Sequence, residues 1–312
     1  MKHYYRLFLI LSWIKSGIIT DVRRHAVCML YSGRSGFMNI GIVGLGLMGG
    51  SFGLALKQSM PGVHITGYDH NETHCQQALS LKLVDEIGDF ERLKACDVIV
   101  LAIPVEGIIK ALKALEDISP ETTVIDLGST KAKIVTECPS KIRQNFVAAH
   151  PMAGLEKFGP TAAIPDLYRG KIVVLCDLEE NALLHSDRAI EIFEALGMVI
   201  VYMKAKEHDR HAAYISHMPH AVSFALANSV MEQEDPRSIL ALAAGGFRDM
   251  SRIAKSSPEM WSDIFMQNSD HLIEAIESFQ TELQKAKEMV EKRDEPALKA
   301  WMQSANELHK IL

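Results

Sequence analysis

The sequence predicts an α/β protein: a doubly wound N-terminal domain followed by an all-α C-terminal domain. Two observations lead to this fold class. Between residue 38 and about residue 203, near-continuous apolar runs alternate with helical patterns, which is typical of a parallel sheet covered on both faces. After about residue 204 the strand patterns stop and only helical patterns follow. We therefore expect one domain over residues 38–204 and a helical domain over residues 205–312.

The strands of the first domain are predicted from short runs rich in β-branched and other apolar residues. These runs cover residues 40–43, 63–68, 97–102, 123–127, 146–149, 173–175 and 199–202. Helical patterns separate the first four, and an amphipathic helix over residues 181–196 separates the last two. Since crossovers between parallel strands are right-handed, the expected sheet is mostly parallel and doubly wound.

Helical segments make up the second domain. The patterns predict helices over residues 207–231, over 236–244 and from Pro258 to the end, with Pro258 in a first turn, where no N–H is needed. The last stretch carries an apolar stripe at helical spacing, formed by Ile264, Leu272, Ile276, Phe279 and Leu283. Such a stripe must be buried, so we expect a homodimer formed through this domain.

Bulk composition excludes some functions and suggests a compartment. A net charge of −6 and a pI near 6.1 give no electrostatic reason to expect nucleic acid as a partner. The five cysteines are scattered and form no Cys-x-x-Cys pair, which fits a reducing, cytoplasmic environment.

The first 37 residues are expected to lie outside the folded domain. Their apolar run, residues 7–14, is too short for a bilayer, which needs about 20 residues, so no membrane association is predicted. Met38 directly precedes the first strand pattern. Residues 1–37 are therefore interpreted as a disordered leader or as the product of an upstream start site.

A glycine-rich turn predicts a dinucleotide site. The turn is Gly44-Leu45-Gly46-Leu47-Met48-Gly49, and it links the first strand to a helix, as the G-x-G-x-x-G motif of a Rossmann-type domain requires. Twenty residues later Asp69 ends the second strand, where a carboxylate can bind ribose hydroxyls and repel a 2′-phosphate. NAD is therefore favoured over NADP, although a protonated His70 could partly tolerate the phosphate.

Three further positions at strand ends are candidates for the site. Ile103 and Pro104 follow the strand 97–102, where they either shape the loop beside the cofactor or simply end the strand. Ser129 and His150 follow two later strands, at the edge where ligands gather in open α/β sheets. A histidine there can be purely structural, but beside a nucleotide site the pair is better interpreted as facing the nicotinamide.

Here the sequence strongly resembles the prephenate dehydrogenases. The match rests on blocks that run in order from residue 38 to about 270: the glycine motif, Gly128-Ser129-Thr130-Lys131, His150-Pro151-Met152-Ala153-Gly154, His208-Asp209, Ile215-Ser216-His217-Met218-Pro219-His220, Gly245-Gly246-Phe247-Arg248-Asp249, Arg252-Ile253-Ala254 and Met260-Trp261. The resemblance implies NAD-dependent oxidative decarboxylation of prephenate to 4-hydroxyphenylpyruvate, in tyrosine biosynthesis.

The resemblance also assigns roles to residues. His150 accepts the proton of the substrate's ring hydroxyl, and Ser129 binds that hydroxyl or orients the imidazole. Arg252 binds a carboxylate of the dianionic substrate. His217 and His220 belong to the substrate-binding block, while Gly245 approaches from the neighbouring subunit with Trp261 nearby. For Arg248 and Lys255 a solvated helix face is the preferred interpretation, and for Trp261 a core role is an equal alternative.

Other functions remain open from the sequence. Arogenate differs from prephenate by an amino group in place of the keto group, and one sequence does not separate the two substrates. A β-hydroxyacid dehydrogenase and a non-catalytic NAD-binding dimer are alternatives of other kinds. The histidines at 208, 211, 217 and 220 suggest a metal site, but no cysteine completes a set and the resemblance implies metal-free chemistry, so none is predicted.

Overall fold

An eight-stranded sheet forms the N-terminal part of the chain in the computed structural model, which describes residues 38–233 and 235–311. The predicted leader, residues 1–37, lies outside the described residues. The strands are β1 (Asn39–Val43), β2 (His64–Tyr68), β3 (Glu86–Ile87), β4 (Val98–Leu101), β5 (Thr123–Asp126), β6 (Phe146–Pro151), β7 (Ile172–Cys176) and β8 (Val199–Met203). Their order is β3-β2-β1-β4-β5-β6-β7-β8, which confirms the doubly wound, Rossmann-type fold.

Two features of the sheet were not predicted. The short strand β3 pairs with β2 through only two residues, too few to leave a pattern in the sequence. β7 runs antiparallel to β6, whereas every other pair is parallel. The segment that joins β6 to β7 contains only one short 3₁₀ turn, Pro160–Ala162, and without a crossover helix the chain returns antiparallel.

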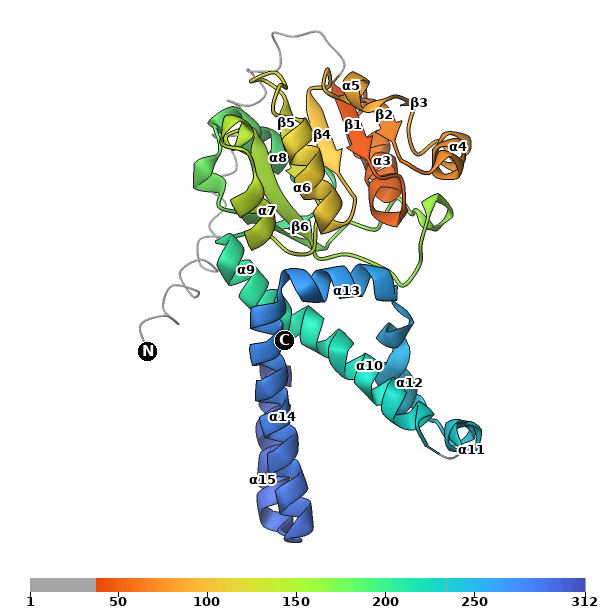
Figure 1. Cartoon of the computed structure of the whole chain (residues 1–312), viewed down its shortest axis with the longest axis vertical. Helices are drawn as coiled ribbons and strands as arrows, with labels where there is room; N and C mark the ends of the chain where they lie inside the picture. The colour runs from red at the N-terminus through yellow and green to blue at the C-terminus, as the bar shows by residue number, and fades with distance from the viewer. Residues whose placement is uncertain (1–37, 234, 312) are drawn as a thin grey trace. The chain divides into compact units, whose positions relative to one another are not determined.

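Helices cover both faces of the sheet (Figure 1). On one face, α3 (Leu47–Ser59) packs near α8 (Leu183–Ala195), with the Phe52 and Phe193 rings 6.1 Å apart. On the other face, α6 (Val105–Ala114) and α7 (Ala132–Glu137) bury Ile108 and Ile134 in the main apolar cluster. Two shorter helices, α4 (Glu72–Ser80) and α5 (Phe90–Leu93), flank β2 and β3.

The described residues after β8 are mainly helical, as predicted. A single helix over residues 207–231 was expected, but the structure divides it into α9 (Ala205–Ala212), a π-helical turn (Ala213–His217) and α10 (Met218–Met231). Pro219 explains the division, because it has no N–H to donate to the preceding turn. Insertions of this kind are frequent at functional sites. Two short helices follow, α11 (Pro236–Ala241) and α12 (Gly245–Ser251).

Three helices form the C-terminal stretch: α13 (Pro258–Gln267), α14 (Ser269–Glu291) and α15 (Glu295–Asn306). α14 and α15 lie side by side (Figure 1). The predicted apolar stripe is buried at Ile264 and Leu272, but Leu283 is 53% exposed. None of the helices in the described part of the chain is long and apolar enough to cross a membrane.

Candidate active site

The glycine motif forms a tight turn whose geometry leaves no room for side chains at two of its positions. Gly44 has a φ of +91°, in the left-handed region that favours glycine. A Cβ on Gly49 would lie 1.9 Å from the Gly44 carbonyl oxygen. At Gly46, by contrast, a Cβ would meet no atom within 4 Å, so this glycine leaves open space rather than relieving a clash.

This open space lies at the N-terminus of α3, which fits a dinucleotide. No side chain of the described residues caps α3, and its first turn holds no acidic residue. Its free N–H groups and dipole therefore suit a pyrophosphate. Asp69 accepts a hydrogen bond from the Leu45 N–H (2.8 Å) through one carboxylate oxygen and from the Asn71 N–H (2.9 Å) through the other, which holds the carboxylate beside the glycine turn.

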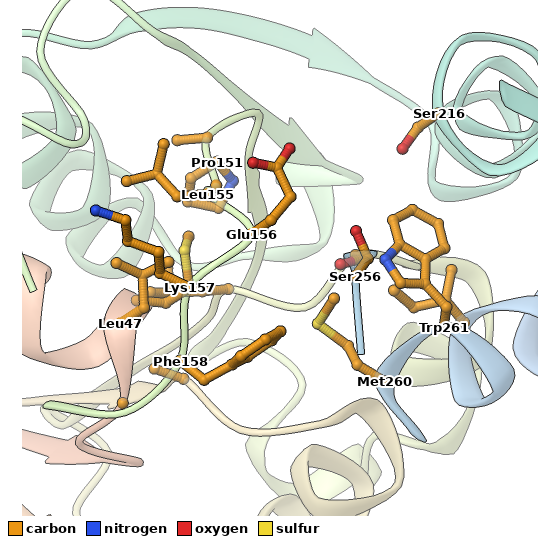
Figure 2. Close-up of a pocket in the computed structure, with 18 of the residues that line it drawn as sticks. Leu47, Pro151, Leu155, Glu156, Lys157, Phe158, Ser216, Ser256, Met260 and Trp261 are labelled. Atoms are coloured by element: carbon orange, nitrogen blue, oxygen red, sulfur yellow. The ribbon is translucent and has the colours of Figure 1, made fainter. Parts of the chain in front are cut away.

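A cavity of about 490 Å³ extends from this turn to the C-terminal helices. Of the predicted residues, those that line it are Gly46, Leu47, Met48, Ser129, His150, His220 and Trp261. Figure 2 shows Leu47, Glu156, Lys157 and Phe158 on one side of this cavity, with Ser216, Met260 and Trp261 on the other. Its volume suits a small organic substrate beside a nicotinamide ring.

The remaining candidates do not line the cavity. Gly44, Gly49 and the fully buried Leu45 shape the turn behind it. Ile103 packs against Gly44, and the exposed Pro104 directly precedes α6.

His150 is the penultimate residue of β6 and is almost fully buried, yet it lines the cavity. Its Nδ1 lies 2.7 Å from Nε2 of His208, whose Nδ1 lies 2.8 Å from a carboxylate oxygen of Asp209. Burial, aided by the nearby His208 and Lys131, lowers the pKa of His150 well below its usual 6.5. The imidazole is therefore neutral near pH 7 and can accept a proton.

A buried ion pair supports the strand ends beside His150. The Lys131 ammonium and the Asp126 carboxylate are fully buried and hydrogen-bonded to each other. Lys131 also donates to the Ala149 carbonyl (2.7 Å), and Asp126 accepts from the N–H groups of Gly128 (2.9 Å) and Ala149 (3.1 Å). These bonds join the end of β5 to the residue that precedes His150.

Two aromatic rings form the far side of the cavity. His220 stacks on Trp261, with ring centroids 3.5 Å apart and planes inclined by 21°. The indole N–H of Trp261 is buried without a hydrogen-bond partner, which leaves a donor for a ligand in this cavity. His217 is also buried, but it does not line the cavity, and its Nδ1 lies 3.1 Å from the Asn268 side-chain nitrogen.

Arg252 and Gly245 are not among the residues that line the cavity. The guanidinium of Arg252 pairs with the carboxylate of Glu156, a cavity residue, and is largely exposed. Gly245 begins α12 and is exposed. Its predicted approach to a neighbouring subunit's pocket is not tested by a single chain and stays a prediction.

The histidines that suggested a metal site have separate surroundings. His208 bonds to His150 and Asp209, His217 contacts Asn268, and His220 hydrogen-bonds the Ser216 carbonyl. Within residues 38–233 and 235–311, no three His, Cys, Asp or Glu side chains form a metal-binding group.

Sequence reasoning gave no role to several residues of this site. Asp209 and Lys131 were noted only as parts of matching blocks, and His208 only in a block and as one of the histidines considered for a metal site. Glu156 follows the His150 block within a loop and leaves no local pattern at all.

Alanine substitutions at Gly46, which borders open space, and at Gly49, which contacts backbone, should have different effects. Gly46→Ala is expected to fold normally but to weaken NAD binding at least about tenfold, because the methyl group takes space needed by the pyrophosphate. Gly49→Ala is expected to lose more than about 2 kcal/mol of stability, because its Cβ meets a backbone oxygen. Calorimetric NAD titration and urea unfolding measure both effects. Equal NAD affinity of Gly46→Ala and the unchanged protein would contradict the placement of the cofactor.

The buried His217 side chain is expected to make the folded protein less stable in mild acid. Burial lowers its pKa from 6.5 to about 4. Between pH 6.5 and pH 4 this histidine is therefore protonated in the unfolded chain but neutral in the folded chain. Stability from this group is complete above pH 6.5 and falls by about 3 kcal/mol on the way to pH 4. In His217→Asn, which keeps a polar atom near Asn268, urea unfolding should show a slope smaller by about 1.4 kcal/mol per pH unit between pH 6 and 5. An unchanged slope would rule out this role.

Known families match both parts of the chain. A model described as the nucleotide-binding domain of prephenate dehydrogenase matches residues 52–202, and one described as its dimerization domain matches residues 204–304. A prephenate dehydrogenase of Bacillus subtilis is 33% identical over 273 residues, which cover 85% of this chain and 74% of that protein.

Solved structures agree with these matches. A prephenate dehydrogenase from Aquifex aeolicus, in complex with hydroxyphenyl propionate and NAD⁺, has a TM-score of 0.83 and 34% identity, covering 89% of this chain and 99% of that one. An arogenate dehydrogenase from Synechocystis has a TM-score of 0.75 and 28% identity, covering 88% of this chain and 100% of that one. With a glycine turn built for a dinucleotide, a buried neutral histidine beside it and these matches over both parts, the chain belongs to the prephenate dehydrogenase family.

Proposed function

We propose that this protein is an NAD-dependent prephenate dehydrogenase, which converts prephenate to 4-hydroxyphenylpyruvate and carbon dioxide. The observation that carries the proposal is that one cavity holds both the open end of α3, at Gly46, and the ring of His150. A hydride acceptor and a proton acceptor can thus reach the same substrate carbon and its hydroxyl. The Aquifex aeolicus relative, solved with hydroxyphenyl propionate and NAD⁺, supports a site that takes a dinucleotide together with a ring compound that carries a carboxylate.

In this reaction the protein positions the substrate and the cofactor and accepts one proton. Bound NAD⁺ supplies the hydride acceptor. His150 accepts the hydroxyl proton at its ring nitrogen while the hydride leaves the same carbon, so that a carbonyl forms. The bond to the ring carboxylate then breaks, its electron pair enters the ring, and carbon dioxide departs. The aromatic product's oxygen takes the proton back from His150, so no net proton is released.

The other cavity residues suit a dianionic ring. We assign Ser129, which lines the cavity, to a hydrogen bond with the hydroxyl, and the free indole N–H of Trp261 to a substrate oxygen. We assign Arg252 to a substrate carboxylate, which would compete with Glu156 for the guanidinium at the cavity's edge.

The proposal extends to assembly and compartment. Ile273, Leu283 and Val290 on α14 are each more than half exposed, and a homodimer through the helical part would cover them, in line with the dimerization-domain match. We place the domain boundary near residue 204, between β8 and α9. The four cysteines within the described residues are free, which fits a cytoplasmic enzyme.

Initial rates of NADH formation test the proposed function. Purified protein is supplied with prephenate or arogenate, each with NAD⁺ or NADP⁺. The proposal predicts the highest kcat/KM for prephenate with NAD⁺, since Asp69 repels a 2′-phosphate. Preference for arogenate would reassign the substrate within the family, and no turnover with either would refute the function.

A further inference from the structure

Behind His150, two residues from the helical part complete a line of three buried polar side chains. His150 Nδ1 lies 2.7 Å from His208 Nε2, and His208 Nδ1 lies 2.8 Å from Asp209 Oδ1. His208 and Asp209 are each only 2% exposed, and they come from α9, 58 residues beyond His150. Both side chains are therefore shielded from bulk water.

We infer the position of each proton from the hydrogen-bond pattern, with His208 taken as a neutral imidazole. Asp209 accepts from the backbone N–H groups of Lys131 (2.7 Å) and Ala132 (2.8 Å), and a carboxylate can only accept. Burial alone would raise the pKa of Asp209, but the bonds from His208 and from these N–H groups lower it overall, so the group is ionised. His208 must then carry its proton on Nδ1.

The proton position on His208 determines the proton position on His150, which lines the cavity. A neutral imidazole holds one proton, so Nε2 of His208 has a lone pair and accepts from His150. His150 consequently carries its proton on Nδ1, and its Nε2 is the bare nitrogen. The order of donation is His150 to His208 to Asp209, with the acceptor end anchored by the start of α7.

We propose that His208 and Asp209 are positioning residues that hold neutral His150 in its Nδ1–H tautomer, with the Nε2 lone pair ready for the substrate's hydroxyl proton. The proposal rests on the proposed function, in which His150 is the proton acceptor. It also gives the pair a second task. When His150 gains the proton, its Nδ1–H still donates to His208, and the Asp209 carboxylate at the end of the line stabilises the positive charge until the proton returns.

Other contacts keep this line rigid. The Asn268 side-chain amide donates to the Asp209 carbonyl (2.7 Å) from the junction of α13 and α14. The Asp209 carboxylate in turn receives two N–H groups at the start of α7. The start of α7 and the junction of α13 and α14 thus hold α9 in place, and the His208 ring has no other hydrogen-bond partner within the described residues.

Two substitutions of His208 separate positioning from a purely structural role. A glutamine amide reaches about as far as Nε2, so in His208→Gln a carbonyl oxygen can still accept the His150 proton. An asparagine amide reaches only as far as Nδ1, so His208→Asn keeps the contact with Asp209 and loses the one with His150. We expect kcat to fall about 100-fold or more in His208→Asn, with KM nearly unchanged, and to stay within about tenfold in His208→Gln.

A structural role predicts the reverse order, because only asparagine preserves the bond to Asp209. Urea unfolding of both variants checks that each is folded. If His208→Asn is as active as His208→Gln, or more active, the positioning role is refuted.

A second measurement does not depend on turnover. Histidine labelled with ¹⁵N reports which ring nitrogen carries the proton, and His150→Asn identifies the His150 signals. Near pH 7 we expect a protonated Nδ1 and a bare Nε2 on His150, changing in His208→Asn. A protonated Nε2 in the unchanged protein would refute the proposal. If no cyclohexadiene substrate is turned over, the proposed function fails while this spectrum still decides the tautomer.

Discussion

His150→Asn should lower kcat for prephenate by about 10³-fold while leaving NAD affinity unchanged. Loss of a general base typically costs 10²- to 10⁴-fold, and asparagine preserves a polar side chain of similar length without a titrating nitrogen. The expected effect is on kcat rather than KM, because His150 changes its bonding to the substrate only as the hydroxyl proton moves. Steady-state rates of NADH formation and calorimetric NAD titration measure the two quantities.

His211→Asn is the matched control for this variant. His211 lies on α9 close in sequence to His208, but it is exposed and does not line the cavity. Its replacement should leave kcat within about twofold, as expected for a surface position. If His150→Asn retains more than a tenth of the activity, His150 is not the proton acceptor.

Lys131→Met should destabilise the fold by about 3–5 kcal/mol, since it leaves the Asp126 carboxylate buried without its counter-ion. Burial pushes the pKa of Asp126 upward, and the Lys131 ammonium and two backbone N–H groups counter it. Without the ammonium the carboxyl group must either stay charged in an apolar interior or take up a proton. Urea unfolding at pH 7 measures the loss.

Two variants make the Lys131 result specific. Lys133→Met removes an ammonium that pairs with Glu106 at the surface and should cost less than about 1 kcal/mol. Asp126→Asn combined with Lys131→Met removes both charges and should recover much of the stability, because the amide oxygen can still accept from Ala149. If Lys131→Met and Lys133→Met lower the free energy of unfolding equally, the buried ion pair contributes no more to stability than the surface pair.

Much of the sheet could be predicted because its signals are local. Apolar runs mark the seven longer strands, and the glycine motif marks the first strand–helix turn by its spacing alone. β3 and the direction of β7 could not be predicted, since one is too short and the other depends on a connection without a helix. The π-helical turn before Pro219 arises from one missing N–H within an otherwise continuous helical pattern.

The site was predicted where its residues stand at strand ends or in matching blocks. Ser129, His150, His220 and Trp261, which are far apart in sequence, line one cavity. Periodicity could not reveal that His208 and Asp209 stand behind His150, because that contact depends on how α9 packs against β6 and α7. Glu156 illustrates the same limit, since only the fold shows that it meets Arg252.

Product stoichiometry tests the central claim most directly. With enzyme in excess over prephenate and NAD⁺ present, a single turnover should form NADH and carbon dioxide in equal amounts, together with 4-hydroxyphenylpyruvate. This result is predicted because hydride transfer and loss of the ring carboxylate occur on one substrate in one cavity. NADH without carbon dioxide, or neither product, would contradict the account.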